Sequence, residues 1–172
     1  MILTALAAAA ALQAADVNCP PDVITAQTWL AGQKAELVDQ FEMQGEATFR
    51  LQTLRPRLLG LTALDAFVVM KPKDGFYPTF GSKVSSTPQT WIFVLPDSDF
   101  AKLAKRFIAT YNPMFGRTDF NCYNRSCATG RSDAGPGRLE SAELKFDQSK
   151  PGWRSWLPAK ETLVLECTYS HS

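Results

Sequence analysis

Arginine is a residue type that binds anions, and four arginines lie on one polar segment of the chain. They lie within residues 116–138, which are rich in glycine, serine, asparagine and aspartate and which we predict to form one long loop. A guanidinium group can form paired hydrogen bonds with a carboxylate or phosphate, and exposed backbone amides can add to such a site. The alternative is a solvated loop whose arginines only keep it soluble. The predicted binding arginines are Arg117, Arg125, Arg131 and Arg138.

Three aromatic residues in a short turn form a second candidate contact surface. The turn, residues 75–81, is bounded by glycines and contains a proline. Aromatic side chains provide a large contact area at low entropy cost, as they do at many protein interfaces. The alternative is that they pack into the core. The predicted contact residues are Phe76, Tyr77 and Phe80.

Four cysteines are present, and their spacing favours disulfide bonds over a metal site. An even number of cysteines in an exported chain indicates disulfides, and four cysteines allow three pairings. Cys122 and Cys127 can close a short loop, and Cys19 would then join the start of the mature chain to Cys167. The spacing of the close pair is wider than that of a zinc knuckle, and the Cys-x-x-Cys redox motif is absent. We therefore predict structural disulfides, no metal and no cofactor.

The sequence contains no recognisable catalytic motif. His171 is the only histidine and lies next to the terminus, where chains are often frayed, so a Ser-His-Asp or Cys-His site is not expected. Gly-x-Ser-x-Gly, His-Glu-x-x-His, the Walker loop and Gly-x-Gly-x-x-Gly are all absent. Catalysis by paired carboxylates is the alternative, because any two of the 17 acidic residues could meet across a cleft. We predict no catalytic residue.

Residues 1–15 predict a signal peptide. Their apolar stretch of about a dozen residues is too short to span a bilayer, which needs roughly 20. Small residues suited to cleavage follow near Ala14 and Ala15. The positive charge that usually precedes a signal core is missing, so an alanine-rich helix that stays on the protein is the alternative. Export predicts a periplasmic or secreted protein with no membrane span in the mature chain.

The composition predicts one globular domain over residues 16–172. The chain has 172 residues, of which 45% are apolar and 20% charged, so it is neither disordered nor membrane-embedded. Its formal net charge is +1, whereas proteins that bind nucleic acids usually carry a strong basic excess. Nucleic acid is therefore not expected as a partner.

The best-specified elements are a strand at residues 91–95 and the helix that follows it. The strand is a continuous run of β-branched and aromatic residues, typical of a strand covered on both faces. Asp97 or Ser98 can cap the helix, and its apolar residues recur on one face until Asn112 and Pro113 end it. We predict this main amphipathic helix at about residues 98–111.

Alternating apolar and polar residues predict further strands. They span residues 23–30, 46–54, 64–71, 139–147 and 161–170, whereas residues 33–43 are ambiguous and fit one face of a helix. Asp74-Gly75 is a hairpin signal. The predicted fold class is α+β, with a mostly antiparallel sheet of about five to seven short strands packed on one main helix.

Two short segments resemble parts of small exported bacterial proteins. They are residues 17–21 and residues 165–169, and small periplasmic lysozyme inhibitors also keep a cysteine in a sheet, but these segments assign no family. The disulfide-permissive setting, the two unusual loops and the lack of a recognisable catalytic set predict a small exported binding or inhibitor-like module without catalytic activity. Its predicted partner is a protein or a cell-envelope polymer. The alternatives are an envelope hydrolase with paired carboxylates and a structural subunit of an envelope assembly.

Overall fold

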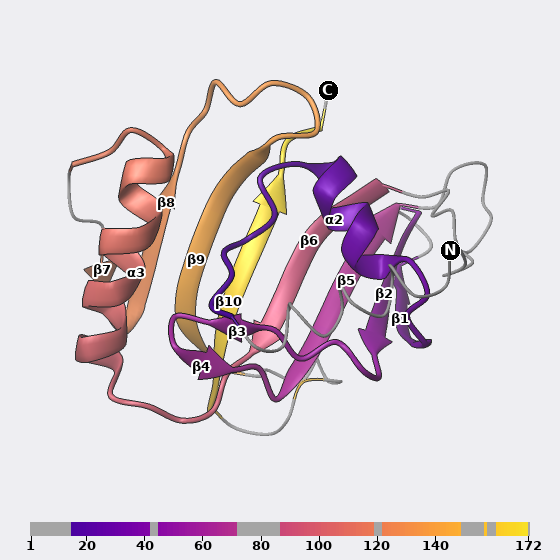
Figure 1. Ribbon diagram of the computed structural model, residues 1–172, viewed down its shortest axis with the longest axis horizontal. Coiled ribbons are helices and arrows are strands. Elements are labelled where there is room, and N and C mark those ends of the chain that lie inside the picture. The colour runs from indigo at the N-terminus through magenta and orange to yellow at the C-terminus, as the bar shows by residue number, and fades with distance from the viewer. Residues whose placement is uncertain are drawn as a thin grey trace.

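An antiparallel sheet of eight strands forms the centre of the protein, in the order β1-β2-β5-β6-β10-β9-β8-β7 (Figure 1). The protein is described by a computed structural model that covers residues 15–41, 45–71, 87–118, 122–148, 157 and 161–171. Two helices and a small two-stranded sheet lie on one face of the large sheet, which we call the inner face (Figure 1). The α+β class and the mostly antiparallel sheet are therefore confirmed, and the described residues contain more strands than we predicted.

The elements have the following bounds. The strands of the large sheet are β1 (Ala35–Phe41), β2 (Glu46–Leu51), β5 (Asp65–Lys71), β6 (Thr87–Val94), β7 (Cys122–Tyr123), β8 (Ser126–Gly130), β9 (Leu139–Gln148) and β10 (Glu161–Tyr169). The small sheet consists of β3 (Arg57–Leu58) and β4 (Leu61–Thr62). The helices are α2 (Val23–Leu30) and α3 (Phe100–Met114).

Strand β6 begins at Thr87, four residues before the predicted strand, and only its apolar run at residues 91–94 is buried on both faces. Trp91 and Phe93 point to the inner face and belong to the main core. Ile92 and Val94 belong to a smaller cluster on the opposite, outer face, which also contains Leu157. Because both faces are covered, no polar residue interrupts the run.

Helix α3 begins and ends later than predicted. Its N-cap is Asp99, not Asp97 or Ser98, because the Asp99 carboxylate accepts hydrogen bonds from two backbone amides of the first turn. Pro113 lies inside the last turn instead of ending the helix before it. The last turn tightens there: the amides of Phe115 and Gly116 bond to carbonyls three residues earlier, so the proline is tolerated close to the helix end.

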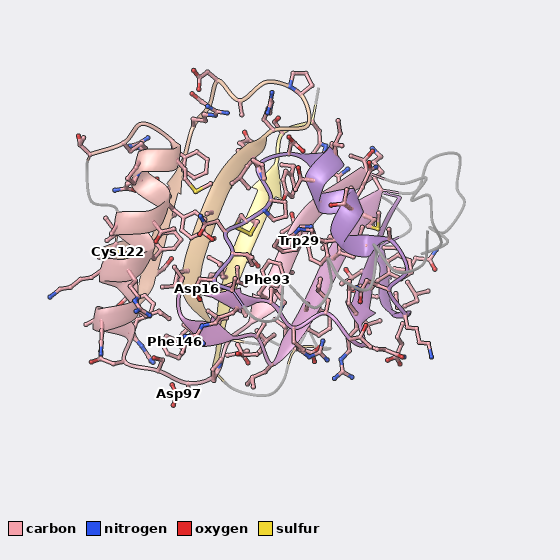
Figure 2. All side chains as sticks on the ribbon, in the orientation of Figure 1. Asp16, Trp29, Phe93, Asp97, Cys122 and Phe146 are labelled. Carbon is pink, nitrogen blue, oxygen red and sulfur yellow. A yellow bond between two sulfur atoms is a disulfide. The ribbon has the colours of Figure 1, made fainter. Side chains whose placement is uncertain are left out.

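Residues 23–30 form helix α2, so the strand predicted there is wrong. Asp22 caps the helix, and its carboxylate accepts a hydrogen bond of 2.8 Å from the amide of Thr25. Ala26, Trp29 and Leu30 are buried, which is a helical spacing. Trp29 packs against Phe93 of β6, at 6.1 Å between ring centroids (Figure 2). The cap and this packing override the strand preference of the β-branched residues at the start of the segment.

The ambiguous residues 33–43 contain edge strand β1, which pairs with β2. The register shifts between Leu37 and Asp39, so a bulge interrupts the strand and obscures its period of two. Strand β2 ends at Leu51, three residues earlier than predicted, and the chain then forms the unpredicted β3–β4 hairpin. The Asp74-Gly75 turn lies outside the described residues, although β5 and β6 are antiparallel neighbours.

Two helices, not one, cover the inner face. Helix α3 packs against β8 and β9, whereas α2 packs against β6 near the middle of the sheet (Figure 1). Both contribute to the same core. The predicted packing on one amphipathic helix is therefore confirmed only in part.

An N-terminal strap, residues 15–22, crosses this core and is fixed by a disulfide. Cys19 is bonded to Cys167 of β10, as predicted for this pair. The amide of Cys19 donates to the hydroxyl of Tyr111 at 3.1 Å, and the hydroxyl of Tyr169 donates to the carbonyl of Pro20 at 3.0 Å. Both phenols are buried, so the strap belongs to the core.

Candidate functional site

The polar segment 116–138 contains a β-hairpin, so the prediction of one long loop is wrong. Strands β7 and β8 pair at Cys122 with Cys127, and a disulfide joins these two cysteines. Asn124 and Arg125 form the turn with positive φ values of 52° and 62°. This is the turn type that matches the twist of a two-residue hairpin. β8 then pairs with β9 along its whole length. The segment contains few apolar residues because its neighbouring elements supply the apolar contacts. Its sequence pattern therefore did not predict a strand.

Arg125 lies at the tip of this hairpin and does not join the other arginines. Its guanidinium carbon lies 3.7 Å from the centroid of the Phe146 ring, a cation–π contact. Its carbonyl also accepts a hydrogen bond from the Phe146 amide at 3.3 Å. Arg125 therefore stabilises the hairpin against β9, at the opposite end of β8 from Arg131.

Arg138 lies at the start of β9 and pairs with the cap of α2. Its guanidinium is 3.6 Å from the Asp22 carboxylate. The hydrogen bond from Thr25, together with Arg138, holds the pKa of Asp22 below its ordinary value. Through this ion pair, Arg138 anchors α2 and the strap.

Arg117 and Arg131 are the two predicted arginines that the fold brings together. Arg117 follows the C-terminal end of α3, where its amide donates to the carbonyl of Asn112 at 2.8 Å. Its side chain reaches the last residue of β8 and contacts the carbonyl of Gly130 at 3.5 Å. Arg131 follows directly, and its amide continues the β8–β9 ladder by donating to Glu140 at 2.9 Å. Figure 1 shows the end of α3 beside the end of β8.

A shallow cleft of about 360 Å³ lies between these two arginines. We call it the arginine cleft. Its lining among the described residues is Arg117, Ala128, Thr129, Gly130, Arg131, Ser132 and Ser141. Two arginines and several small residues line one space, and no carboxylate is among the described lining residues. The register places the Thr129 side chain on the inner face of the sheet and the Ser141 side chain on the outer face. Such a lining suits an oxyanion, because each guanidinium offers several hydrogen-bond donors and a fixed positive charge.

Three polar residues of the cleft were not predicted from the sequence. Thr129 and Ser132 lie in the polar segment, and Ser141 comes from β9. The register places Ser141 opposite Gly130. A Cβ atom on Gly130 would lie 2.9 Å from that of Ser141, so only glycine allows this approach. Isolated serines and threonines carry no signal of their own, and only the strand pairing brings these residues together.

Thr129 differs from the other hydroxyls of the cleft because it is buried. The residue is only 6% exposed, and its hydroxyl oxygen has no hydrogen-bond partner in the described part of the chain. Buried polar atoms in folded proteins nearly always have a partner. The unpaired hydroxyl therefore lowers the stability of the folded state locally.

The predicted contact residues Phe76, Tyr77 and Phe80 lie outside the described residues. They remain a prediction. The most exposed aromatic residue among the described ones is Tyr123, in the β7–β8 hairpin, with 83% of its surface exposed.

Among the described residues, two glutamates lie together and bear on the hydrolase alternative with paired carboxylates. Glu143 of β9 and Glu166 of β10 are directly opposite in register. The Lys145 ammonium lies 3.2 Å from each carboxylate, and Ser126 donates to Glu143 at 3.0 Å. An ammonium shared between two carboxylates is typical of a structural ion cluster, whereas acid–base catalysis needs two carboxyls in contrasting environments. Glu143 is the register partner of Ala128, which lines the arginine cleft, but neither glutamate is among the described lining residues.

His171 lies at the end of β10 with its side chain exposed. Partial burial lowers the pKa of His171, and the negative charges of Glu140 and Glu46 oppose this shift only in part. The described residues contain no group of three or more His, Cys, Asp or Glu side chains that could hold a metal. Among them, neither helix has the length and apolar character to cross a membrane.

No protein-family model, curated protein or solved structure matches the chain.

Proposed function

We propose that the protein is an exported binding module that captures an anionic partner through the arginine cleft and has no catalytic role. The observation that carries the proposal is the meeting of Arg117 and Arg131, from different elements, at one cleft whose described lining includes no carboxylate. The fixed positive charges of arginine side chains attract acidic groups and raise their local concentration. The partner is a cell-envelope polymer or a protein that carries carboxylates or phosphates.

The disulfide bonds of the protein support export. Two disulfides and no free cysteine in the described residues fit an oxidising compartment, such as the periplasm or the cell exterior. Residues 1–15 are the proposed signal peptide. The turn at residues 75–81 lies outside the described residues, so the proposal depends on the arginines alone.

Retention on immobilised anionic polymers tests this function. The probes are polygalacturonate, a carboxylated polysaccharide, and polyglutamate, a carboxylated polypeptide. We expect the wild-type protein to be retained on at least one of them at low salt and released as salt rises, because ions screen the attraction. Arg117→Ala/Arg131→Ala should lose most of this retention, with little change in the melting temperature, because both side chains are exposed.

A matched variant controls for net charge. Lys102→Ala/Lys105→Ala removes two positive charges from the exposed face of α3, close to the helix end that is remote from the cleft. Its retention should stay close to that of the wild type. If both double variants lose retention equally, or neither does, the arginine cleft is not the binding site.

A further inference from the structure

The two disulfides differ in how far their cysteines are exposed to solvent. Cys19 and Cys167 belong to the main core and are at most 1% exposed, and Cys127 is fully buried as well. Cys122 is the exception, because this residue is only partly buried. A disulfide is reduced when a thiolate attacks one of its sulfurs, so the rate depends on access to that sulfur. A reducing agent can therefore approach the Cys122–Cys127 bond more easily than the Cys19–Cys167 bond.

Strand β7 is the short edge strand that the Cys122–Cys127 bond joins to the sheet. It has two residues, and its one neighbour in the described strand order is β8. One of its two register pairs is the disulfide itself, and the other joins Ser126 to Tyr123, which is 83% exposed. Segments with few buried apolar contacts open at a low cost in free energy. We therefore expect β7 to separate from β8 when the disulfide is reduced.

The same disulfide helps to position Arg117. Cys122 follows Arg117 by five positions in the chain, so the bond anchors the segment that carries this arginine. At its other end, the segment is held by the Arg117 amide, which donates to the carbonyl of Asn112. The side chain of Arg117 contacts the Gly130 carbonyl at 3.5 Å, which is long for a hydrogen bond. Release of β7 would remove one of the two anchors, and the guanidinium would then be less well preorganised at the cleft.

Arg131 is positioned independently of this disulfide. Its amide donates to the carbonyl of Glu140 at 2.9 Å, and β8 pairs with β9 along its whole length. These contacts do not involve β7. Reduction should therefore disturb the Arg117 side of the cleft and leave the Arg131 side in place.

We infer that the Cys122–Cys127 disulfide is a redox control on the arginine cleft, which binds its anionic partner more weakly after a dithiol has reduced this bond. This inference rests on the proposed function and adds the regulation of its site. The reductant belongs to the class of dithiols, such as the Cys-x-x-Cys site of a thiol–disulfide oxidoreductase.

The reduction proceeds in two thiol–disulfide exchanges. A thiolate of the reductant attacks the Cys122 sulfur, the bond to Cys127 breaks, and Cys127 leaves as a thiolate that takes up a proton. The second thiol of the reductant loses its proton and attacks the mixed disulfide, which releases Cys122 as a thiolate that is protonated in turn. Two electrons and two protons thus pass to the protein, and the reductant leaves as a disulfide.

Graded reduction of the folded protein tests whether this bond is the accessible one. The oxidised wild type is incubated with dithiothreitol without denaturant, quenched in acid and unfolded, and its free thiols are labelled with N-ethylmaleimide for peptide mass mapping. We expect Cys122 and Cys127 to be reduced at least tenfold faster than Cys19 and Cys167, because both cysteines of the long bridge are buried. Equal rates, or earlier reduction of Cys19–Cys167, would overturn the inference.

Polymer retention of the selectively reduced protein tests the effect on the cleft. The probes are polygalacturonate and polyglutamate, and circular dichroism monitors the fold. We expect reduction to lower the salt concentration at which the protein elutes from the polymer that retains it, and oxidised glutathione should restore the original elution by re-forming the bond. Cys122→Ser/Cys127→Ser should elute like the reduced wild type and should not respond to dithiothreitol.

Two further variants separate an effect on Arg117 from a general effect of the reductant. Arg117→Ala lacks the side chain that the disulfide positions, so its elution should be the same before and after reduction. Lys102→Ala/Lys105→Ala keeps the whole cleft and should respond to reduction as the wild type does.

The results distinguish this inference from the proposed function. If selective reduction leaves the elution unchanged, unfolds the protein, or changes Arg117→Ala as much as the wild type, the redox inference is overturned. If retention of the oxidised protein still depends on Arg117 and Arg131, the proposed function stands without this control. If neither polymer is retained in an arginine-dependent way, both proposals fail.

Discussion

For each predicted arginine, the residue type indicated that it binds anions, but it did not indicate which residues the side chain contacts in the fold. Arg117 and Arg131 meet at the cleft, whereas Arg125 stacks on Phe146 and Arg138 pairs with Asp22. These different roles depend on the β8–β9 register and on where α3 ends, and neither was evident from a polar segment with few apolar residues. Ser141 could not have been predicted at the cleft, because only this pairing brings it beside Gly130.

At the same scale, Lys145 is expected to be important for stability. Its ammonium lies between Glu143 and Glu166, which are directly opposite on neighbouring strands, and Glu166 is only 7% exposed. Lys145→Met would leave two like charges facing each other, so we expect a loss of about 2 kcal/mol in the free energy of unfolding, reduced from the buried-pair value by partial exposure. Urea denaturation measures this loss.

A double variant and a surface control complete that test. Lys145→Met/Glu166→Gln removes the repulsion and should recover much of the stability. Lys102→Met, on the exposed face of α3, should change stability by less than about 0.5 kcal/mol. If Lys145→Met is as harmless as Lys102→Met, the ion cluster contributes nothing to the fold.

At the scale of elements, the strand–helix pair β6–α3 was predictable and α2 was not. The run at residues 91–95 is apolar throughout, and α3 has one apolar face, so each pattern fits only one kind of element. Residues 23–30 combine β-branched residues with a helical cap, and the packing of Trp29 on Phe93 decides between the two structures. That contact joins residues far apart in the sequence. Local pattern alone therefore could not identify this helix.

The two disulfides should differ in their contributions to stability. Cys19–Cys167 closes a separation of 148 residues, and Cys122–Cys127 closes one of 5. On the chain-entropy model these correspond to upper values of about 5 and about 2 kcal/mol. We expect Cys19→Ser/Cys167→Ser to lower the free energy of unfolding by more than Cys122→Ser/Cys127→Ser does. Equal losses in urea denaturation would contradict this order.

The short disulfide is also expected to influence binding through the hairpin. It lies at the start of β8, whose far end carries Arg131. Loss of this bond leaves the β8–β9 ladder in place, so polymer retention should decrease less than in the arginine double variant.

At the scale of the whole molecule, the two buried tyrosines connect the strap to the core. Tyr111 comes from α3 and Tyr169 from β10, and each is hydrogen-bonded to the strap near Cys19. Burial raises the pKa of Tyr111 to about 12 and raises the pKa of Tyr169 further. One layer of the core thus depends on two phenols that must stay protonated.

This burial predicts a specific loss of stability at high pH. The pKa of Tyr111 in the folded protein lies above its ordinary value of 10.0, so the folded state holds the proton more tightly than the unfolded state does. The resulting stability is fully present below pH 10 and is lost as the pH rises toward 12. Urea denaturation at several alkaline pH values should show this decline. Tyr111→Phe should make the decline shallower, and an unchanged pH profile for this variant would contradict the assignment.

The central claim is that the arginine cleft receives the anionic group of the partner, and amide NMR of isotope-labelled protein tests it most directly. The protein is titrated with short oligomers of galacturonate and of glutamate while every assigned amide is followed. We predict that at least one oligomer shifts the amides of Gly130, Arg131, Ser132 and Ser141, while those of the hairpin tip and of α2 stay in place. Shifts confined to Tyr123, Arg125 or Arg138, or no shifts with either oligomer, would contradict the claim.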